Sequence, residues 1–95
     1  MIPDSIEIIE NYAFEGCINL TELTIGKNVK KIGQTSFGYC LNLPKMTFLG
    51  KPEYIDPFAF YNTPKLKTIN VPWAKDEVPG APWGATAARI NYNVK

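Results

Sequence analysis

The stretch that decides the fold is IPDSIEIIENYAFEGCINLTELT, residues 2–24, because two diverged copies of it follow directly, at 25–47 and 48–70. The period of 23 residues is visible column by column. With 45% apolar residues, chance would make about two of the 23 columns apolar in all three copies, against five observed. The five columns are Ile2, Ile25 and Phe48; Ile9, Ile32 and Ile55; Phe14, Phe37 and Phe60; Leu20, Leu43 and Leu66; Leu23, Met46 and Ile69.

A 23-residue unit cannot bury its own apolar face, whereas stacked units can, so the repeat predicts a solenoid. Alternating apolar residues predict strands at 20–25, 43–48 and 66–71, and the region 6–9 is also extended in character. The segment 11–17 is too short for a stable helix and suits one helical turn with Asn11 as its N-cap. Each copy is therefore expected to contain a strand, a turn, a second strand and a short helical turn.

The last quarter of the chain differs in composition from the repeats. Val71 continues the column of Ile2 and begins a fourth strand, so residues 1–73 form the repeat region and 74–95 a C-terminal capping segment. Within that segment Pro82 is expected to begin a short helix, and residues 89–93 to return as a short strand along the sheet edge. Trp73 and Trp83 are expected to cover the last turn, although exposed tryptophans would instead suit stacking on a sugar ring or a partner.

The motif Ala13-Phe14-x-x-Cys17-x-x-Leu20-x-x-Leu23 resembles the BspA-type leucine-rich repeat of bacterial and some protist surface proteins. The second copy keeps the motif with Gly26 for proline and Ser36 for alanine, and the third keeps Ala59-Phe60 with Thr63 for cysteine. The resemblance implies a mainly β leucine-rich-repeat solenoid, display outside the cell, binding of proteins or extracellular matrix, and no enzymatic activity. Three repeats and no visible signal peptide lead us to expect a C-terminal fragment of a longer surface protein.

Composition excludes several classes of function. Ten basic against nine acidic residues give a net charge of +1, without the basic excess that nucleic-acid binding needs. The absence of histidine excludes Ser–His and Cys–His triads and histidine-containing zinc sites. No apolar run approaches the ~20 residues of a membrane helix, so membrane insertion is not expected. We therefore expect no catalytic residues, no metal site and no cofactor.

Two further column patterns have structural interpretations. Cys17 and Cys40 lie one repeat apart and are expected to be free, buried thiols, because parallel side chains in one column have poor disulfide geometry. Opposite charges share two columns. They should stack on neighbouring turns and stabilise the strand register on a solvated face. The first of these columns holds Glu7, Lys30 and Glu53, and the second holds Glu22 and Lys45.

Three functions remain open. The first is a protein- or matrix-binding module that uses the outward positions of the strands. The second is a glycan-binding module that uses Trp73, Tyr54, Tyr61 and Trp83 if they are exposed, and the third is a structural stalk. The open N-terminal turn could also stack end to end on a second copy. The expected partner-binding face consists of Thr21, Glu22, Thr24, Lys45, Thr47, Lys67, Thr68 and Asn70, together with Pro44.

Overall fold

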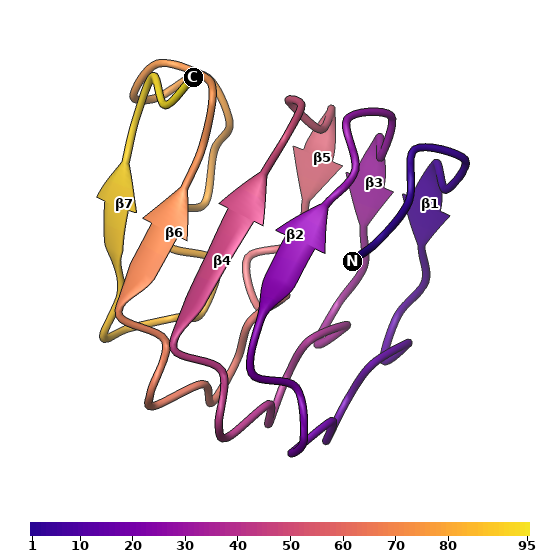
Figure 1. Cartoon of the computed structure of the whole chain (residues 1–95), viewed down its shortest axis with the longest axis vertical. Helices are drawn as coiled ribbons and strands as arrows, with labels where there is room; N and C mark the ends of the chain where they lie inside the picture. Colours follow the sequence, from indigo (N-terminus) through magenta and orange to yellow (C-terminus); the bar gives the residue numbers. More distant parts are fainter.

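The computed structural model describes all 95 residues (Figure 1). The chain winds into a coil of about four turns, whose strands form two sheets of parallel strands, and it contains no helix. One sheet has the strand order β1-β3-β5 and the other the order β2-β4-β6-β7. The seven strands are β1 (Ile8–Ile9), β2 (Leu23–Ile25), β3 (Lys31–Ile32), β4 (Lys45–Phe48), β5 (Tyr54–Ile55), β6 (Thr68–Asn70) and β7 (Arg89–Asn91). The sequence-based prediction of a β-solenoid is confirmed.

The register of the sheets follows the sequence repeat. Ile9 lies opposite Ile32, and Leu23 lies opposite Met46, each pair 23 residues apart. The same spacing holds between β3 and β5 and between β4 and β6. Each of the first three turns adds one strand to each sheet, and the fourth turn adds β7 to the four-stranded sheet only. Because the chain always winds in the same direction, all pairings are parallel.

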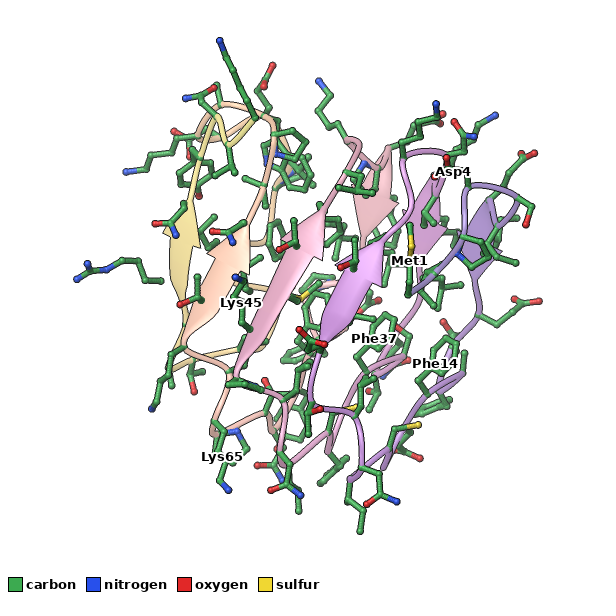
Figure 2. All side chains as sticks on the ribbon, viewed as in Figure 1. Met1, Asp4, Phe14, Phe37, Lys45 and Lys65 are labelled. Atoms are coloured by element: carbon green, nitrogen blue, oxygen red, sulfur yellow. The ribbon has the colours of Figure 1, made fainter.

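The core lies between the two sheets and consists of the predicted apolar columns. In β2 the side chains of Leu23 and Ile25 are buried and that of Thr24 is only partly so, as expected for a strand with one face on the core. Phe37 is fully buried and contacts the equivalent phenylalanines of both neighbouring turns. Figure 2 shows Phe14 and Phe37 side by side in the lower half of the coil.

The segments that lead from the three-stranded sheet back to the four-stranded sheet are hydrogen-bonded turns. The amide of Ala13 donates to the carbonyl of Glu10, and that of Cys17 to Phe14, but these bonds do not continue into a helix. The N-cap role of Asn11 is wrong. Its Oδ1 accepts the amide of Gln34 in the next turn, 2.8 Å away, because stacking places that donor within reach.

The C-terminal segment adds a fourth turn that is two residues shorter than the others. Strand β7 pairs with β6, with Ile69 opposite Ile90 at a spacing of 21 residues, so the expected edge strand is confirmed. The short helix expected from Pro82 onward is wrong. Trp83 and Gly84 have φ angles of 53° and 90°, outside the range of a right-handed helix, and the segment forms separate turns instead.

Both tryptophans belong to the core. Trp73 and Trp83 are 4% and 0% exposed, and their ring centroids are 6.1 Å apart. Each packs against Phe48 of the third turn, at 5.2 Å for Trp73 and 6.1 Å for Trp83. The prediction that they cover the last repeat is confirmed, and they are not available as an exposed stacking surface.

Candidate functional site

The predicted partner-binding positions lie on the outer face of the four-stranded sheet. In β4 the side chains of Lys45 and Thr47 point away from the core, whereas Met46 and Phe48 are buried. Figure 2 shows Lys45 projecting from this strand. The parallel register places equivalent positions of β2 and β6 beside them, so the structure brings the predicted residues together on one surface. We call this surface the strand face.

Polar side chains cross the strand face in register. Thr24, Thr47, Asn70 and Asn91 occupy one column, one residue from each strand. The amide nitrogen of Asn91 donates to Oδ1 of Asn70 at 2.8 Å, and that of Asn70 reaches Oγ1 of Thr47 at 3.5 Å. Such side-chain ladders hold the strands in register and leave hydroxyl and amide groups facing solvent.

A shallow hollow of about 210 Å³ lies at the β2 end of the strand face. Thr21, Glu22 and Thr24 line one side of it, and Pro44, Lys45 and Thr47 line the other. The hollow offers hydroxyl groups, one carboxylate and one ammonium group, and only one of its lining residues, Leu23, is a large apolar one. It suits a polar contact with a partner surface.

The strand face includes two residues that the sequence analysis missed. Arg89 lies opposite Thr68, and Asn91 opposite Asn70, so both share the outer side of β7 with the predicted residues. The dipeptide Ile-Asn at 69–70 and 90–91 is the signal that relates the two strands, but the shortened spacing hides it. With Arg89 included, the face carries the bases Lys45, Lys67 and Arg89 against the single acid Glu22, a net charge of +2.

The predicted charge columns are in register, but only one of their pairs is an ion pair. Lys30 Nζ lies 3.6 Å from Glu7 Oε1, and both side chains are more than half exposed. Exposed pairs of this kind contribute about 0–1 kcal/mol. Glu22 directly precedes β2 and Lys45 begins β4, and the two side chains do not form an ion pair.

The two cysteines are free thiols, but their environments differ. Cys40 is buried, and its Sγ donates to the carbonyl of Phe14 at 3.4 Å. Burial raises the pKa of the Cys40 thiol to about 11, which makes it a poor nucleophile at neutral pH. Cys17 is only partly buried, so the expectation that both thiols are buried is wrong for Cys17, which belongs to the first turn and is covered on one side only.

The acidic residues and cysteines of the structure do not form a metal-binding cluster. No three Cys, Asp or Glu side chains lie close enough together to hold a metal ion. The adjacent acids Asp76 and Glu77 lie in an exposed loop. Glu77 accepts the amide of Ala74 at 2.7 Å and pairs with Lys51 at 3.6 Å, and these two contacts lower its pKa. Glu77 therefore holds the loop against the third turn.

The aromatic residues considered for glycan binding are not gathered at one place. Trp73 and Trp83 are buried, whereas Tyr54 and Tyr61 are exposed. Tyr54 lies on β5, where its hydroxyl donates to Asp56 at 3.2 Å, and Tyr61 lies in the following turn. A sugar platform built from all four residues is therefore wrong, because burial removes both tryptophans from the surface.

Comparison with known proteins identifies the family of the repeats. The family model described as a BspA type leucine-rich repeat region of six copies matches residues 1–79. No curated protein and no solved structure matches the chain. The structure contains no helix with the length and apolar content needed to cross a membrane.

Proposed function

The chain belongs to the BspA-type leucine-rich repeat family, and from this membership we propose that it is a non-catalytic, protein-binding module of an extracellular or cell-surface protein. The observation that carries the proposal is the strand face, where polar residues from four strands form one continuous surface. The partner is a protein, such as a component of an extracellular matrix. A purely structural stalk would make no use of this surface.

The charge of the strand face favours an acidic patch on the partner. Lys67 and Arg89 lie towards the β6–β7 side of the face, and the single carboxylate, Glu22, lies at the β2 end. Complementary charge steers association and raises the association rate constant. The affinity of one module is modest, because the face is shallow and largely polar, and additional repeats in one polypeptide would raise it through multivalency.

Charge reversal tests the proposal. A variant with Lys45→Glu and Lys67→Glu removes two exposed bases from the face. Its matched control carries Lys31→Glu and Lys75→Glu, exposed positions on β3 and in the C-terminal loop, with the same change in net charge. Binding to a panel of purified matrix proteins is measured by surface plasmon resonance at two salt concentrations.

We expect the strand-face variant to lose at least tenfold in affinity for the bound matrix protein, mainly through slower association, whereas the control binds like the wild type. If both variants lost affinity equally, the interaction would depend on the net charge of the protein alone and not on the strand face. Binding that survives in the strand-face variant would place the partner elsewhere and contradict the proposal.

A second copy of the chain is the other partner that we propose. Strand β2 is an edge strand that pairs on its outer side only through the bridge between Ile2 and Ile25, and β1 is the edge of the second sheet. Ile8 and Ile18 of this end are more than half exposed. Edge strands beside exposed apolar groups favour end-to-end stacking. Sedimentation velocity should show association that rises with concentration and is abolished by Ile18→Asp, and a monomer at all concentrations would contradict it.

A further inference from the structure

A second concave surface, which the strand face does not include, lies on the turns that lead back to the four-stranded sheet. It is a groove of about 430 Å³, formed by residues from the first three turns of the coil. We call it the aromatic groove. Its lining residues are Tyr12, Glu15, Gln34, Thr35, Tyr39, Phe58 and Tyr61.

The groove exists because the middle turn has small residues where its neighbours have large ones. Thr35 lies between Tyr12 and Phe58 in the repeat, and Gly38 lies between Glu15 and Tyr61. A Cβ atom on Gly38 would collide with Thr35 and lie 3.3 Å from the carbonyl oxygen of Tyr61, so the backbone there is packed too closely for a side chain. With about 4.8 Å between neighbouring turns, the large residues are about two spacings apart, which leaves room for one planar group.

Tyr39 holds its ring over this groove from a strained backbone position. Its φ angle is 58°, in the left-handed region that bulky residues seldom adopt. The equivalent residues of the neighbouring turns are Gly16 at 74° and Asn62 at 57°, both residue types that tolerate this conformation. The Tyr39 ring is 40% exposed and meets Tyr61 edge to face at 5.8 Å. Tyr12 and Thr35, which also line the groove, have positive φ angles of 61° and 52°, so three of the lining residues have a backbone conformation that side chains with a Cβ seldom adopt.

The charge around the aromatic groove is negative. The turn segments 10–19, 33–42 and 56–64 contain the carboxylates Glu10, Glu15 and Asp56 and no lysine or arginine. Four aromatic rings beside a carboxylate attract a cation through their quadrupoles as well as through its charge. The lining offers hydrogen-bond acceptors at the Glu15 carboxylate and the Gln34 amide oxygen, and hydroxyl groups at Thr35 and the tyrosines.

An arginine guanidinium meets these conditions together. It is planar, weakly hydrated and permanently charged, it stacks on aromatic faces, and it carries five N–H donors for the acceptors of the lining. A quaternary ammonium group has no N–H donors and would make no hydrogen bond to Glu15 or Gln34. A lysine ammonium is more strongly hydrated and cannot stack.

We propose that the aromatic groove binds an arginine side chain of a protein partner, with the guanidinium between the rings of the first and third turns and Glu15 as its counter-ion. This site is separate from the strand face, and its test does not depend on the function proposed for that face.

The test is a titration of the isotope-labelled protein with the peptide acetyl-Gly-Gly-Arg-Gly-Gly-amide, followed by NMR chemical shifts. The matched control replaces arginine with citrulline, which has nearly the same shape but no charge. We expect shifts at Tyr12, Tyr39 and Tyr61, and at least about tenfold weaker binding of the citrulline peptide, in keeping with the loss of the cation–π and charge interactions. Equal binding of both peptides, or shifts confined to Thr24 and Thr47, would overturn the proposal.

Two variants separate recognition from folding. Tyr39→Asn removes the ring and places a residue suited to positive φ at this position, so the melting temperature should stay the same or rise while arginine binding falls about tenfold. Glu15→Gln should weaken binding without loss of stability, because Glu15 is exposed, and Glu53→Gln, an exposed position outside the groove lining, serves as its control. Wild-type affinity in Tyr39→Asn, or equal effects of Glu15→Gln and Glu53→Gln, would contradict the site.

Discussion

Phe14 and Phe37 stack with their ring centroids 5.2 Å apart and their planes inclined by only 7°. Phe60 continues the stack at 5.5 Å and 17°. The 23-residue repeat thus becomes a ladder of parallel rings in which each turn covers the ring of the turn before it. Phe37 is the middle member and is fully buried, whereas Phe14 is covered on one side and remains partly exposed.

The position in this stack sets the effect of removing each ring. Phe37→Ala should lower the free energy of unfolding by about 3–5 kcal/mol, the usual range for a fully buried phenylalanine. Phe14→Ala should have less than half that effect, because its ring already meets solvent. Urea unfolding followed by circular dichroism measures both values. Similar losses in the two variants would mean that the first turn is covered in solution, for example by a second copy.

The buried thiol of Cys40 should make the protein less stable at alkaline pH. Its pKa is raised from 9.0 to about 11 in the folded chain, so the stabilisation is present below pH 9 and is lost as the pH rises towards 11. Cys40→Thr introduces the residue found at Thr63 in the same column and removes the titration. We expect the stability of the wild type to fall more steeply than that of Cys40→Thr between pH 9 and 11 in thermal melts. Parallel pH profiles for the two proteins would show that folding does not raise the pKa of the Cys40 thiol.

Cys17 is only partly buried and Cys40 is buried, so the two thiols should differ in reactivity. In the folded protein at pH 8 one equivalent of iodoacetamide should react quickly, at Cys17, and the second only after denaturation, at Cys40. Mass spectrometry of the alkylated peptides identifies the sites. Equal rates at both cysteines, or a disulfide between them in freshly purified protein, would contradict this assignment.

The repeat made most of the fold predictable from sequence. Columns such as Ile9, Ile32 and Ile55 keep apolar residues at a constant spacing, and that spacing became the strand register without change. The outward residues of the strand face followed from the same alternation, because in a strand every second residue leaves the core.

The parts that could not be predicted are those where the period is broken or where residues from different columns combine. Arg89 and Asn91 lie on the strand face at a spacing of 21, so no 23-residue column contains them. The aromatic groove depends on the small residues Thr35 and Gly38 and on a tyrosine at position 39, where the neighbouring repeats have glycine or asparagine, so no conserved apolar column indicates it. The N-cap prediction for Asn11 was wrong because the amide that donates to its side chain belongs to Gln34 of the next turn and not to its own turn.

The two buried tryptophans should respond differently to loss of the indole N–H. Nε1 of Trp83 donates to the carbonyl of Pro79 at 3.0 Å, whereas Nε1 of Trp73 is buried without an acceptor. Phenylalanine at Trp83 removes a hydrogen bond and leaves a carbonyl without its donor, while at Trp73 it removes an unpaired donor. We expect Trp83→Phe to be more destabilising than Trp73→Phe by about 1–2 kcal/mol, in chemical unfolding followed by circular dichroism. The reverse order would mean that a water or another group pairs with Trp73.

The C-terminal segment should be required for the stability of the repeats and not serve as a ligand arm. Its removal at residue 74 takes away β7, the carbonyl of Trp83 that accepts the amide of Phe60, and the buried ring of Trp83. The truncated chain would expose the edge of β6 and the rings of Phe48 and Phe60, so we expect a sharply lower melting temperature and self-association through the new edge. Truncation after Asn93 is the control, since it keeps β7 and loses only the bond from Val94 to Val71 near the end of the chain. Calorimetry and sedimentation velocity measure both effects. A truncated protein that stays monomeric and equally stable, yet loses a partner, would make the segment a binding element, because the packing of Trp83 would then contribute nothing to the fold.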